Sequence, residues 1–279
     1  MDFLEALHAR VVPGDGAMGT LLMARGVPRD ACLEELCVSD PDRIGAIHRE
    51  YLEAGAQVIR THSFGSNAVR LAKHGLERRV GELNWLAARI ARDATKGSGA
   101  IVAASIGPTG QGDSAREILE EQMGALLDGG AQMVMLETFT DLRELLIAVE
   151  VKHTLHHCPV VASVACGNRT DVAEAFGELK RAGADVVGVN CLGDPRQVAA
   201  VLPEADPEIT LAAFPSAGLP TDEGGGNLSY GIDPETFAAG VAELVSRGVR
   251  FVGGCCGTTP EHIAALSVRL GLREAAKNS

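Results

Sequence analysis

Residues 182–202 read AGADVVGVNCLGDPRQVAAVL and contain one complete unit of the pattern that decides the fold. The run Val186–Asn190 is almost continuously apolar, which is typical of a strand buried on both faces of a parallel sheet. The stretch Gln197–Leu202 has the amphipathic pattern of a helix. Gly183 stands where a glycine can take the left-handed conformation that ends a preceding helix. The segment therefore predicts a strand followed by a helix, with Cys191 at the end of the strand.

The same alternation of a short apolar run and an amphipathic stretch occurs eight times along the chain. The predicted strands are Val11–Pro13, Val58–Thr61, Ile101–Ile106, Met133–Glu137, Val160–Val164, Val186–Asn190, Ile209–Phe214 and Phe251–Gly254. The predicted helices are Asp42–Ala54, Leu83–Thr95, Ala115–Leu127, Leu142–Thr154, Val172–Ala182, Gln197–Leu202, Pro234–Ser246 and Pro260–Leu270. Strict alternation predicts an α/β protein with a parallel sheet. Eight units predict closure into a (β/α)8 TIM barrel, with residues 1–279 as a single domain.

Short phrases that contain glycine precede four of the predicted strands. They are Ala54-Gly55-Ala56, Gly129-Gly130-Ala131, Ala182-Gly183-Ala184 and Arg247-Gly248-Val249. We interpret them as helix-to-strand turns at the floor of the barrel, with no catalytic role. Pro220–Asn227 (PTDEGGGN) is the stretch with the weakest pattern, and its position after the seventh strand predicts a loop at the mouth.

The composition limits the possible partners and compartments. The formal net charge is −12 at pH 7, so most of the surface would repel a nucleic-acid backbone. No apolar run reaches the roughly 20 residues of a membrane span, and the start MDFLEALHAR lacks the pattern of a secretory signal. The seven cysteines are an odd number, which fits reduced thiols better than a disulfide framework. We therefore expect a cytoplasmic protein that binds neither nucleic acid nor membranes.

Three cysteines fall at the carboxyl ends of predicted strands, where the chemistry of such barrels is located. Cys191 follows the sixth strand, and Cys255 and Cys256 follow the eighth, framed by glycines. Three protein ligands with a fourth position left open are the pattern of a catalytic zinc site, whereas four ligands indicate a structural one. We predict that Cys191, Cys255 and Cys256 bind Zn²⁺.

Two other interpretations of these residues stay open at this point. An isolated cysteine usually packs as a small apolar side chain, and this is our prediction for the remaining four, Cys32, Cys37, Cys158 and Cys166. Gly253 and Gly254 could instead belong to a phosphate-binding loop, which would indicate a phosphosugar enzyme. The loop offers no Lys or Arg that would favour this interpretation.

Four motifs resemble the homocysteine S-methyltransferase family. They are GGCCGTTPEHI at residues 253–263, DGAMGT at 15–20, ETF at 137–139 and GVNC at 188–191. The family includes the homocysteine-binding module of cobalamin-dependent methionine synthase and the betaine– and S-methylmethionine–homocysteine methyltransferases. The resemblance covers essentially the whole chain, and it implies a zinc barrel in which Cys191, Cys255 and Cys256 are the metal ligands.

The resemblance also implies where the substrate binds. Asp15 and Glu137 match positions that hold the amino acid part of homocysteine. Gly16 adjoins Asp15, His62 follows the second strand and Ser216 follows the seventh, and these three complete the set of candidate substrate-binding residues.

The chain departs from the usual family pattern at the mouth. Arg60-Thr61-His62-Ser63-Phe64 stands where many relatives have Glu-Thr-Asn-Thr-Phe, and Pro215-Ser216-Ala217-Gly218 where many have Pro-Asn-Ala-Gly. Ala165-Cys166-Gly167-Asn168 replaces a longer segment after the fifth strand. These changes predict an altered donor preference with homocysteine retained as the acceptor. Arg60 could pair with an acid in the barrel and is left without a role.

The resulting functional hypothesis is transfer of a methyl group from an unidentified donor to the thiol of L-homocysteine, which gives methionine. A free alkyl thiol has a pKa of about 8.5, whereas a zinc-bound thiol is deprotonated. Alternatives are a methyltransferase with another thiol acceptor, or a thiol- or zinc-binding module to which a partner delivers the methyl group. The sequence contains no recognisable cobalamin-binding or folate-reductase segment, so the donor could be a small molecule, or a corrinoid or folate bound to a partner protein.

Overall fold

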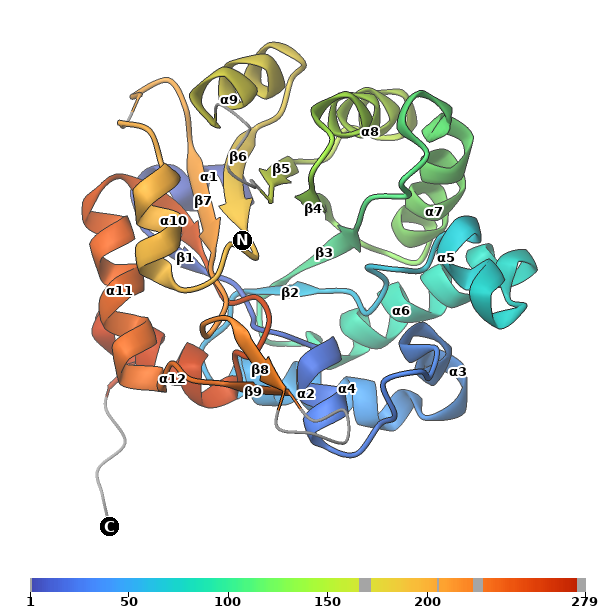
Figure 1. Cartoon of the computed structure of the whole chain (residues 1–279), viewed down its shortest axis with the longest axis horizontal. Coiled ribbons are helices and arrows are strands. Elements are labelled where there is room, and N and C mark those ends of the chain that lie inside the picture. Colours follow the sequence, from blue (N-terminus) through green and yellow to red (C-terminus); the bar gives the residue numbers. More distant parts are fainter. Residues whose placement is uncertain (1, 166–171, 205, 223–227, 275–279) are drawn as a thin grey trace.

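In the described parts of the chain, residues 2–165, 172–204, 206–222 and 228–274, eight parallel strands form a closed barrel (Figure 1). They are β1 (Val12–Pro13), β2 (Val58–Arg60), β3 (Ile101–Ile106), β4 (Met133–Phe139), β5 (Val160–Val164), β6 (Val186–Asn190), β7 (Leu211–Phe214) and β10 (Val249–Val252). In this computed structural model the sheet order is β1-β10-β7-β6-β5-β4-β3-β2. A parallel bridge between Gly14 and Val58 joins the two ends of the sheet, so the (β/α)8 prediction is confirmed.

Helices surround the barrel and follow its strands (Figure 1). Those that match the predicted helices within a few residues are α4 (Pro41–Glu53), α6 (Val80–Ala94), α7 (Arg116–Asp128), α8 (Leu142–Leu155), α9 (Val172–Arg181), α10 (Pro195–Val201), α11 (Pro234–Ser246) and α12 (Pro260–Arg269). Several begin at an aspartate that accepts a backbone N–H of the first turn and is followed by proline, as at Asp194 and Asp233. Such a cap satisfies a donor that the helix itself leaves unpaired, which fixes where the helix begins.

Alternate side chains of each strand point into the barrel, and this alternation determines which residues reach the site. Val58 packs inside the barrel and Ile59 packs outside it, against the helices. The next residue, Arg60, therefore points inward at the carboxyl end of β2. In β4 the same rule takes Met133 and Met135 inward and places Glu137 in the layer above them.

The floor of the barrel is built as the sequence predicts. Gly55, Gly130, Gly183 and Gly248 all have φ between 96° and 106°, the left-handed conformation expected at these helix-to-strand turns. A short helix not among the predicted elements, α1 (Phe3–Ala9), closes the floor from below. Its Phe3 and Leu7 join the interior core, and the Phe3 ring packs edge-on against Phe251 at a centroid distance of 5.1 Å.

The structure corrects the predicted elements in three places. The last strand ends at Val252, so Gly253 and Gly254 belong to the loop beyond it. Part of the predicted loop after β7 is an antiparallel hairpin of β8 (Pro220–Asp222) and β9 (Leu228–Tyr230), with the intervening residues outside the described ones. The loops after β1 and β2 contain short helices that were not predicted, namely α2 (Gly19–Ala24), α3 (Leu36–Ser39) and α5 (Ala68–Leu71). These elements were missed because each is too short to give a periodic pattern.

None of the helices in the described residues has the length and apolar character needed to cross a membrane.

Candidate metal and substrate site

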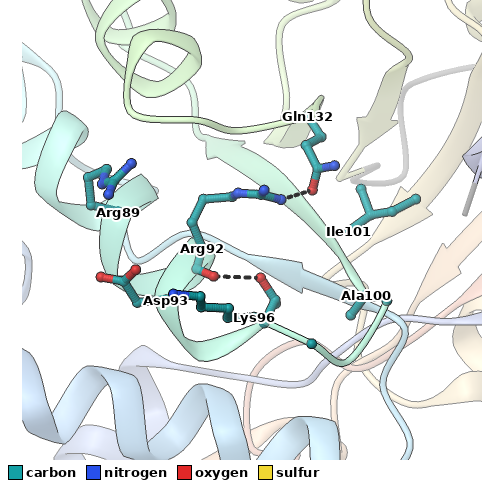
Figure 2. Close-up of a pocket in the computed structure, with 10 residues that line it drawn as sticks. Arg89, Arg92, Asp93, Lys96, Ala100, Ile101 and Gln132 are labelled. Carbon is teal, nitrogen blue, oxygen red and sulfur yellow. Dashed lines mark hydrogen bonds between the residues drawn. The ribbon is translucent and has the colours of Figure 1, made fainter.

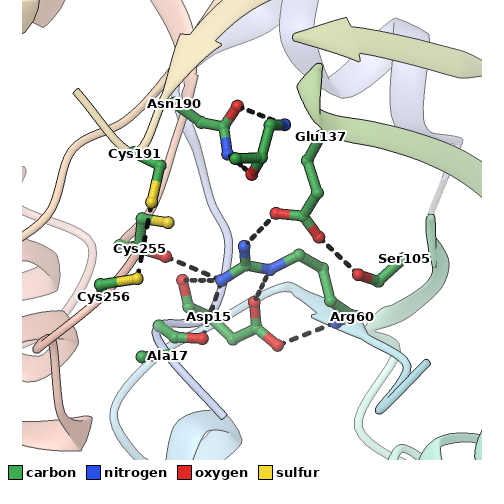
Figure 3. Close-up of polar contacts among 12 residues, drawn as sticks. Asp15, Ala17, Arg60, Ser105, Glu137, Asn190, Cys191, Cys255 and Cys256 are labelled. Carbon is green, nitrogen blue, oxygen red and sulfur yellow. Dashed lines mark hydrogen bonds and ion pairs between the residues drawn. The ribbon is translucent and has the colours of Figure 1, made fainter. Parts of the chain in front are cut away.

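Three cysteine sulfurs converge at the mouth of the barrel (Figure 3). Cys191 follows β6 and the adjacent pair Cys255–Cys256 follows β10, yet their Sγ atoms all lie within 4.8 Å of one another. The Sγ atoms of Cys191 and Cys256 are 3.5 Å apart. The three residues are only partly buried, so the cluster is open toward the cavity. The convergence inferred from the strand ends is therefore present in the structure.

The loop that carries Cys255 and Cys256 is held on both sides by hydrogen bonds to other strand ends. Cys255 N–H donates to the Pro215 carbonyl (2.8 Å), and the Cys256 carbonyl accepts from Ala217 N–H (2.9 Å). On the other side, Gly254 N–H donates to the Asp15 carbonyl (2.9 Å). A Cβ on Gly253 would lie 2.7 Å from that same carbonyl oxygen, so a glycine is required for this close approach.

These hydrogen bonds also bear on the phosphate-loop interpretation. A phosphate site in such a loop needs backbone N–H groups that are free to point at the ligand. Here the N–H groups of Gly253, Gly254 and Cys255 donate to carbonyls, and that of Gly257 donates to Thr20 Oγ1. These N–H groups are therefore not free to bind a phosphate, and the loop instead positions the cysteines.

Cys191 has an unusual backbone conformation that directs its side chain. Its φ is 58°, and Thr138 at the end of β4 has φ 65°, both in the region that non-glycine residues rarely adopt. The side chain of the buried Asn190 supports this arrangement, because it accepts from Thr138 N–H (2.8 Å) and donates to Thr138 Oγ1 (2.7 Å). Strained backbone held by neighbouring groups is frequent at functional sites.

The chemistry of the three thiols favours a bound cation. Hydrogen bonds from Cys255 and Cys256 lower the pKa of Cys191 to about 3. The hydrogen bond to Cys191 raises the pKa of Cys256 to about 12, and the same interaction, with burial, raises that of Cys255. One thiolate thus opposes ionisation of the other two, and a metal cation would remove this opposition because all three could then bind it as thiolates.

A buried arginine lies next to the cysteines and binds both predicted substrate carboxylates (Figure 3). Arg60 Nε donates to Asp15 Oδ1 (2.7 Å), and Arg60 Nη1 donates to Glu137 Oε2 (2.7 Å). The three residues are 9%, 4% and 5% exposed. Although burial disfavours the charged guanidinium, the carboxylates of Glu137 and Asp15 raise the pKa of Arg60 well above its ordinary value.

The remaining donors and acceptors of this cluster are also satisfied within the protein. Arg60 Nη2 donates to the Gly16 and Gly254 carbonyls (2.7 Å each), and the Arg60 backbone N–H donates to Asp15 Oδ2 (2.8 Å). Ser105 Oγ donates to Glu137 Oε1 (2.5 Å). Burial raises the pKa of Asp15 and the charge of Arg60 opposes the rise. Because both Asp15 oxygens accept N–H bonds, the geometry corresponds to the ionised carboxylate.

A cavity of about 400 Å³ connects the cysteines with this cluster. Its polar lining includes Asp15, Arg60, His62 and Glu137 together with the three cysteines, and its apolar lining includes Met18, Met23, Leu33 and Phe64. A cavity of this size and mixed lining is suited to a small ligand with both polar and apolar parts.

Of the other predicted substrate residues, Gly16 and His62 line this cavity and Ser216 does not. His62 Nε2 lies 2.7 Å from the Leu33 carbonyl. Burial lowers the pKa of His62, although the nearby Glu34 opposes this. Ser216 is directed to a metal-ligand candidate, because its hydroxyl lies 3.9 Å from Cys191 Sγ. The sequence assigns Arg60 no role beyond a possible pairing with an acid in the barrel, and the structure confirms that pairing and identifies the acids as Asp15 and Glu137.

Cys32, Cys37 and Cys158 are not part of the cluster. Cys37 is buried, as predicted for a core side chain, whereas Cys32 and Cys158 are only partly buried. Cys166 lies outside the described residues, as does most of the segment Ala165-Cys166-Gly167-Asn168.

A separate hollow of about 460 Å³ lies at the opposite end of the barrel, beside the first residue of β3 (Figure 2). Arg89, Arg92 and Lys96 line it, and Arg92 Nη1 donates to Gln132 Oε1 (2.6 Å). The same Gln132 oxygen accepts from Val102 N–H (3.2 Å), which ties a helix to the sheet. This hollow is remote from the strand carboxyl ends, and its contacts are those of a structural support.

Comparison with known proteins identifies the family. The model of the homocysteine S-methyltransferase family matches residues 13–270. Methionine synthase of Mycobacterium tuberculosis is 32% identical over 295 residues, which cover 94% of this chain and 25% of that protein. Methionine synthase of Mycobacterium leprae is 31% identical, with 94% and 24% covered. The chain thus spans about a quarter of the length of these methionine synthases.

Solved structures show the same fold. The homocysteine methyltransferase MmuM from Escherichia coli, in its metallated form, superposes with a TM-score of 0.75 at 24% identity, covering 95% of this chain and 99% of that one. Its oxidised form gives a TM-score of 0.77 at the same identity and coverage.

Proposed function

Because the chain belongs to the homocysteine S-methyltransferase family, we propose that it transfers a methyl group to the thiol of L-homocysteine and so produces methionine. The observation that carries this proposal is the convergence of three cysteine sulfurs within 4.8 Å at the mouth of the barrel. They adjoin a cavity of about 400 Å³ that also contains charged side chains. The cavity offers a place for a thiol beside the sulfurs and for the polar end of an amino acid beside Asp15, Arg60 and Glu137.

We propose zinc as the resident metal, held by Cys191, Cys255 and Cys256. Three protein ligands with an open fourth position are the pattern of catalytic zinc sites, and soft sulfur ligands disfavour magnesium and calcium. Bound there, zinc would keep the acceptor sulfur deprotonated at neutral pH. The cluster supports this because its three Sγ atoms lie within 4.8 Å of one another, and a cation at that point would stabilise all three as thiolates.

The protein's own part in the reaction is to bind and orient. A bond forms between the acceptor sulfur and the methyl carbon while the bond from that carbon to the donor breaks and the donor keeps the electron pair. This displacement needs sulfur, methyl group and leaving group in line. The apolar side chains of Met18, Met23, Leu33 and Phe64, which line the cavity, would exclude water around the methyl group.

The methyl donor is a further part of the proposal. Because the chain spans about a quarter of the length of the methionine synthases that it matches, we propose that the methyl group arrives either on a small molecule or on a corrinoid or folate bound to a partner protein. His62 and Ser216 stand where the family commonly has amide side chains, and their different size and hydrogen-bonding capacity favour an altered donor preference.

A donor screen on the zinc-loaded protein tests the proposed function. Metal content is measured first, with about one zinc per chain expected. S-methylmethionine, betaine, methylcobalamin and methylfolate are then supplied with homocysteine or cysteine as acceptor, and methylated thiol is measured by mass spectrometry. Methionine formation with at least one donor supports the proposal. Preference for cysteine would contradict the acceptor, and tight homocysteine binding without transfer from any donor would favour a module that depends on a partner.

A further inference from the structure

We infer that Arg60 determines acceptor specificity, because its guanidinium occupies the cation position between Asp15 and Glu137. The site should then bind alkyl thiols that lack an α-ammonium group about as well as it binds homocysteine. The inference rests on the proposed function, since it concerns how the thiol acceptor of that reaction is recognised. An acceptor recognised mainly through its sulfur is thereby distinguished from one recognised through its ammonium group.

All four carboxylate oxygens of Asp15 and Glu137 already accept a hydrogen bond from the protein. Asp15 Oδ1 and Oδ2 accept from Arg60 Nε and from its backbone N–H, and Glu137 Oε2 accepts from Arg60 Nη1. The fourth oxygen, Glu137 Oε1, accepts from Ser105 Oγ. Every oxygen to which a substrate ammonium would donate therefore already has a donor from the protein, at distances between 2.5 and 2.8 Å.

The positive charge of Arg60 also weakens the attraction of this site for a substrate ammonium group. Two ionised carboxylates would attract an ammonium strongly in a buried site, but Arg60 neutralises one of the two charges. An ammonium that reached the same oxygens would also lie close to the guanidinium, and like charges at such distances repel strongly where water is excluded. The cluster thus offers a second cation little net attraction.

Arg60 is also held in place by several contacts, so its displacement would be energetically unfavourable. Its Nη2 donates to the carbonyls of Gly16 and Gly254, and its guanidinium carbon lies 5.1 Å from the centre of the Phe214 ring. Displacing the guanidinium would leave two carbonyls without a donor and a buried charge without its partners, which is unfavourable. Arg60 is therefore a permanent part of the acceptor pocket.

Thiol binding to the cobalt-substituted wild-type protein tests this inference without a methyl donor. Thiolate-to-cobalt charge-transfer absorption reports binding at the metal, and two ligands are compared, L-homocysteine and 4-mercaptobutanoate, which lacks only the ammonium group. We expect dissociation constants within about tenfold of each other, since a charge-assisted ammonium contact would separate them by about tenfold or more. A homocysteine preference greater than about tenfold would overturn the inference.

Failure of the proposed function would be distinguishable from failure of this inference. If neither thiol changes the cobalt spectrum, the metal-site proposal fails, and the inference that rests on it fails too. If homocysteine binds and 4-mercaptobutanoate does not, the proposed function stands and only the role of Arg60 is overturned.

Two variants separate specificity from support of the fold. Arg60→Leu vacates the cation position, so homocysteine should become preferred over 4-mercaptobutanoate by about tenfold or more, and an unchanged ratio would overturn the inference. Glu137→Gln keeps the size of the side chain and is the variant to measure if Arg60→Leu does not fold. It should alter the affinity for both thiols equally, whereas a selective loss of homocysteine binding would show that Glu137 holds the ammonium.

Discussion

The two walls of the barrel mouth differ in whether their ionisable side chains are paired with an opposite charge from the chain itself. On the wall formed by the ends of β6 and β10, three thiols lie close together, and the Cys191 thiol raises the pKa of the other two. On the wall formed by β1, β2 and β4, two carboxylates have a buried arginine between them. We propose that the first wall takes a cation from outside the chain, whereas the second contains the guanidinium of Arg60.

This difference shows how one scaffold can keep one function and alter another. Both walls consist of residues at the strand ends, where (β/α)8 barrels vary their chemistry on a common scaffold. The Arg60 guanidinium and the Cys255 loop are joined through the Gly254 carbonyl, so the two walls share a hydrogen bond while differing in what they can bind. The cysteine wall is suited to a metal, and the arginine wall determines which end of the acceptor is recognised.

Removing one sulfur should have the largest effect. Cys255→Ala leaves two thiol ligands, and we expect zinc content to fall from about one to below about 0.1 per chain after dialysis, because catalytic zinc sites use three protein ligands. Inductively coupled plasma mass spectrometry measures the metal. The matched control is Cys158→Ala at a partly buried cysteine outside the cluster, which should retain zinc. Stoichiometric zinc in Cys255→Ala would show that the site is wrongly assigned.

Removing the guanidinium of Arg60 should lower the free energy of unfolding. Arg60→Leu leaves Asp15 and Glu137 buried without their common partner, and breaking a buried pair in this way typically costs about 3–5 kcal/mol of the free energy of unfolding. Urea denaturation at pH 7 measures it.

A surface ion pair is the control for this comparison. Arg25 donates to Glu50, and their side chains are 39% and 36% exposed, so Arg25→Leu should cost at most about 1 kcal/mol. Equal losses in the two variants would mean that the Arg60 cluster is no more important to the fold than an exposed pair.

The last expected effect concerns the pH dependence that a buried histidine gives to stability. His48 on α4 is fully buried, and neither ring nitrogen has a hydrogen-bond partner within the described part of the chain. Burial lowers the pKa of His48 to about 3, so between about pH 6.5 and pH 3 the unfolded chain binds a proton that the folded chain does not. The free energy of unfolding should therefore fall as the pH falls through this window, by up to about 1.4 kcal/mol per unit.

Replacing this side chain tests the pH dependence directly. His48→Leu should reduce the slope of unfolding free energy against pH between about pH 6.5 and 4.5, the part of the window accessible to denaturation experiments. The exposed His74, changed to Gln, serves as the control and should leave that slope as in the wild type. An unchanged slope in His48→Leu would contradict the assignment, and loss of zinc in this variant would show that His48 also affects the mouth.

The sequence by itself predicted the architecture and the cysteine cluster. Runs such as Val160–Val164 are strands because continuous apolar character fits a sheet covered on both faces, and this information is local. The cysteines could be placed because topology alone brings the carboxyl ends of all parallel strands to one end of the barrel. The identity of the metal and the substrate roles of Asp15, Gly16, Glu137, His62 and Ser216 remain proposals, as does a single domain over residues 1–279.

Only the tertiary structure decided what Arg60 does. Its partners Asp15, Glu137 and Gly254 lie 45, 77 and 194 residues away in the sequence, and no local pattern indicates which of them a side chain will reach. The left-handed backbone of Cys191 likewise depends on contacts at the ends of β4 and β6. Periodicity reports which face of an element is buried, but the pairing of charges inside the barrel depends on how the strand ends are packed against one another.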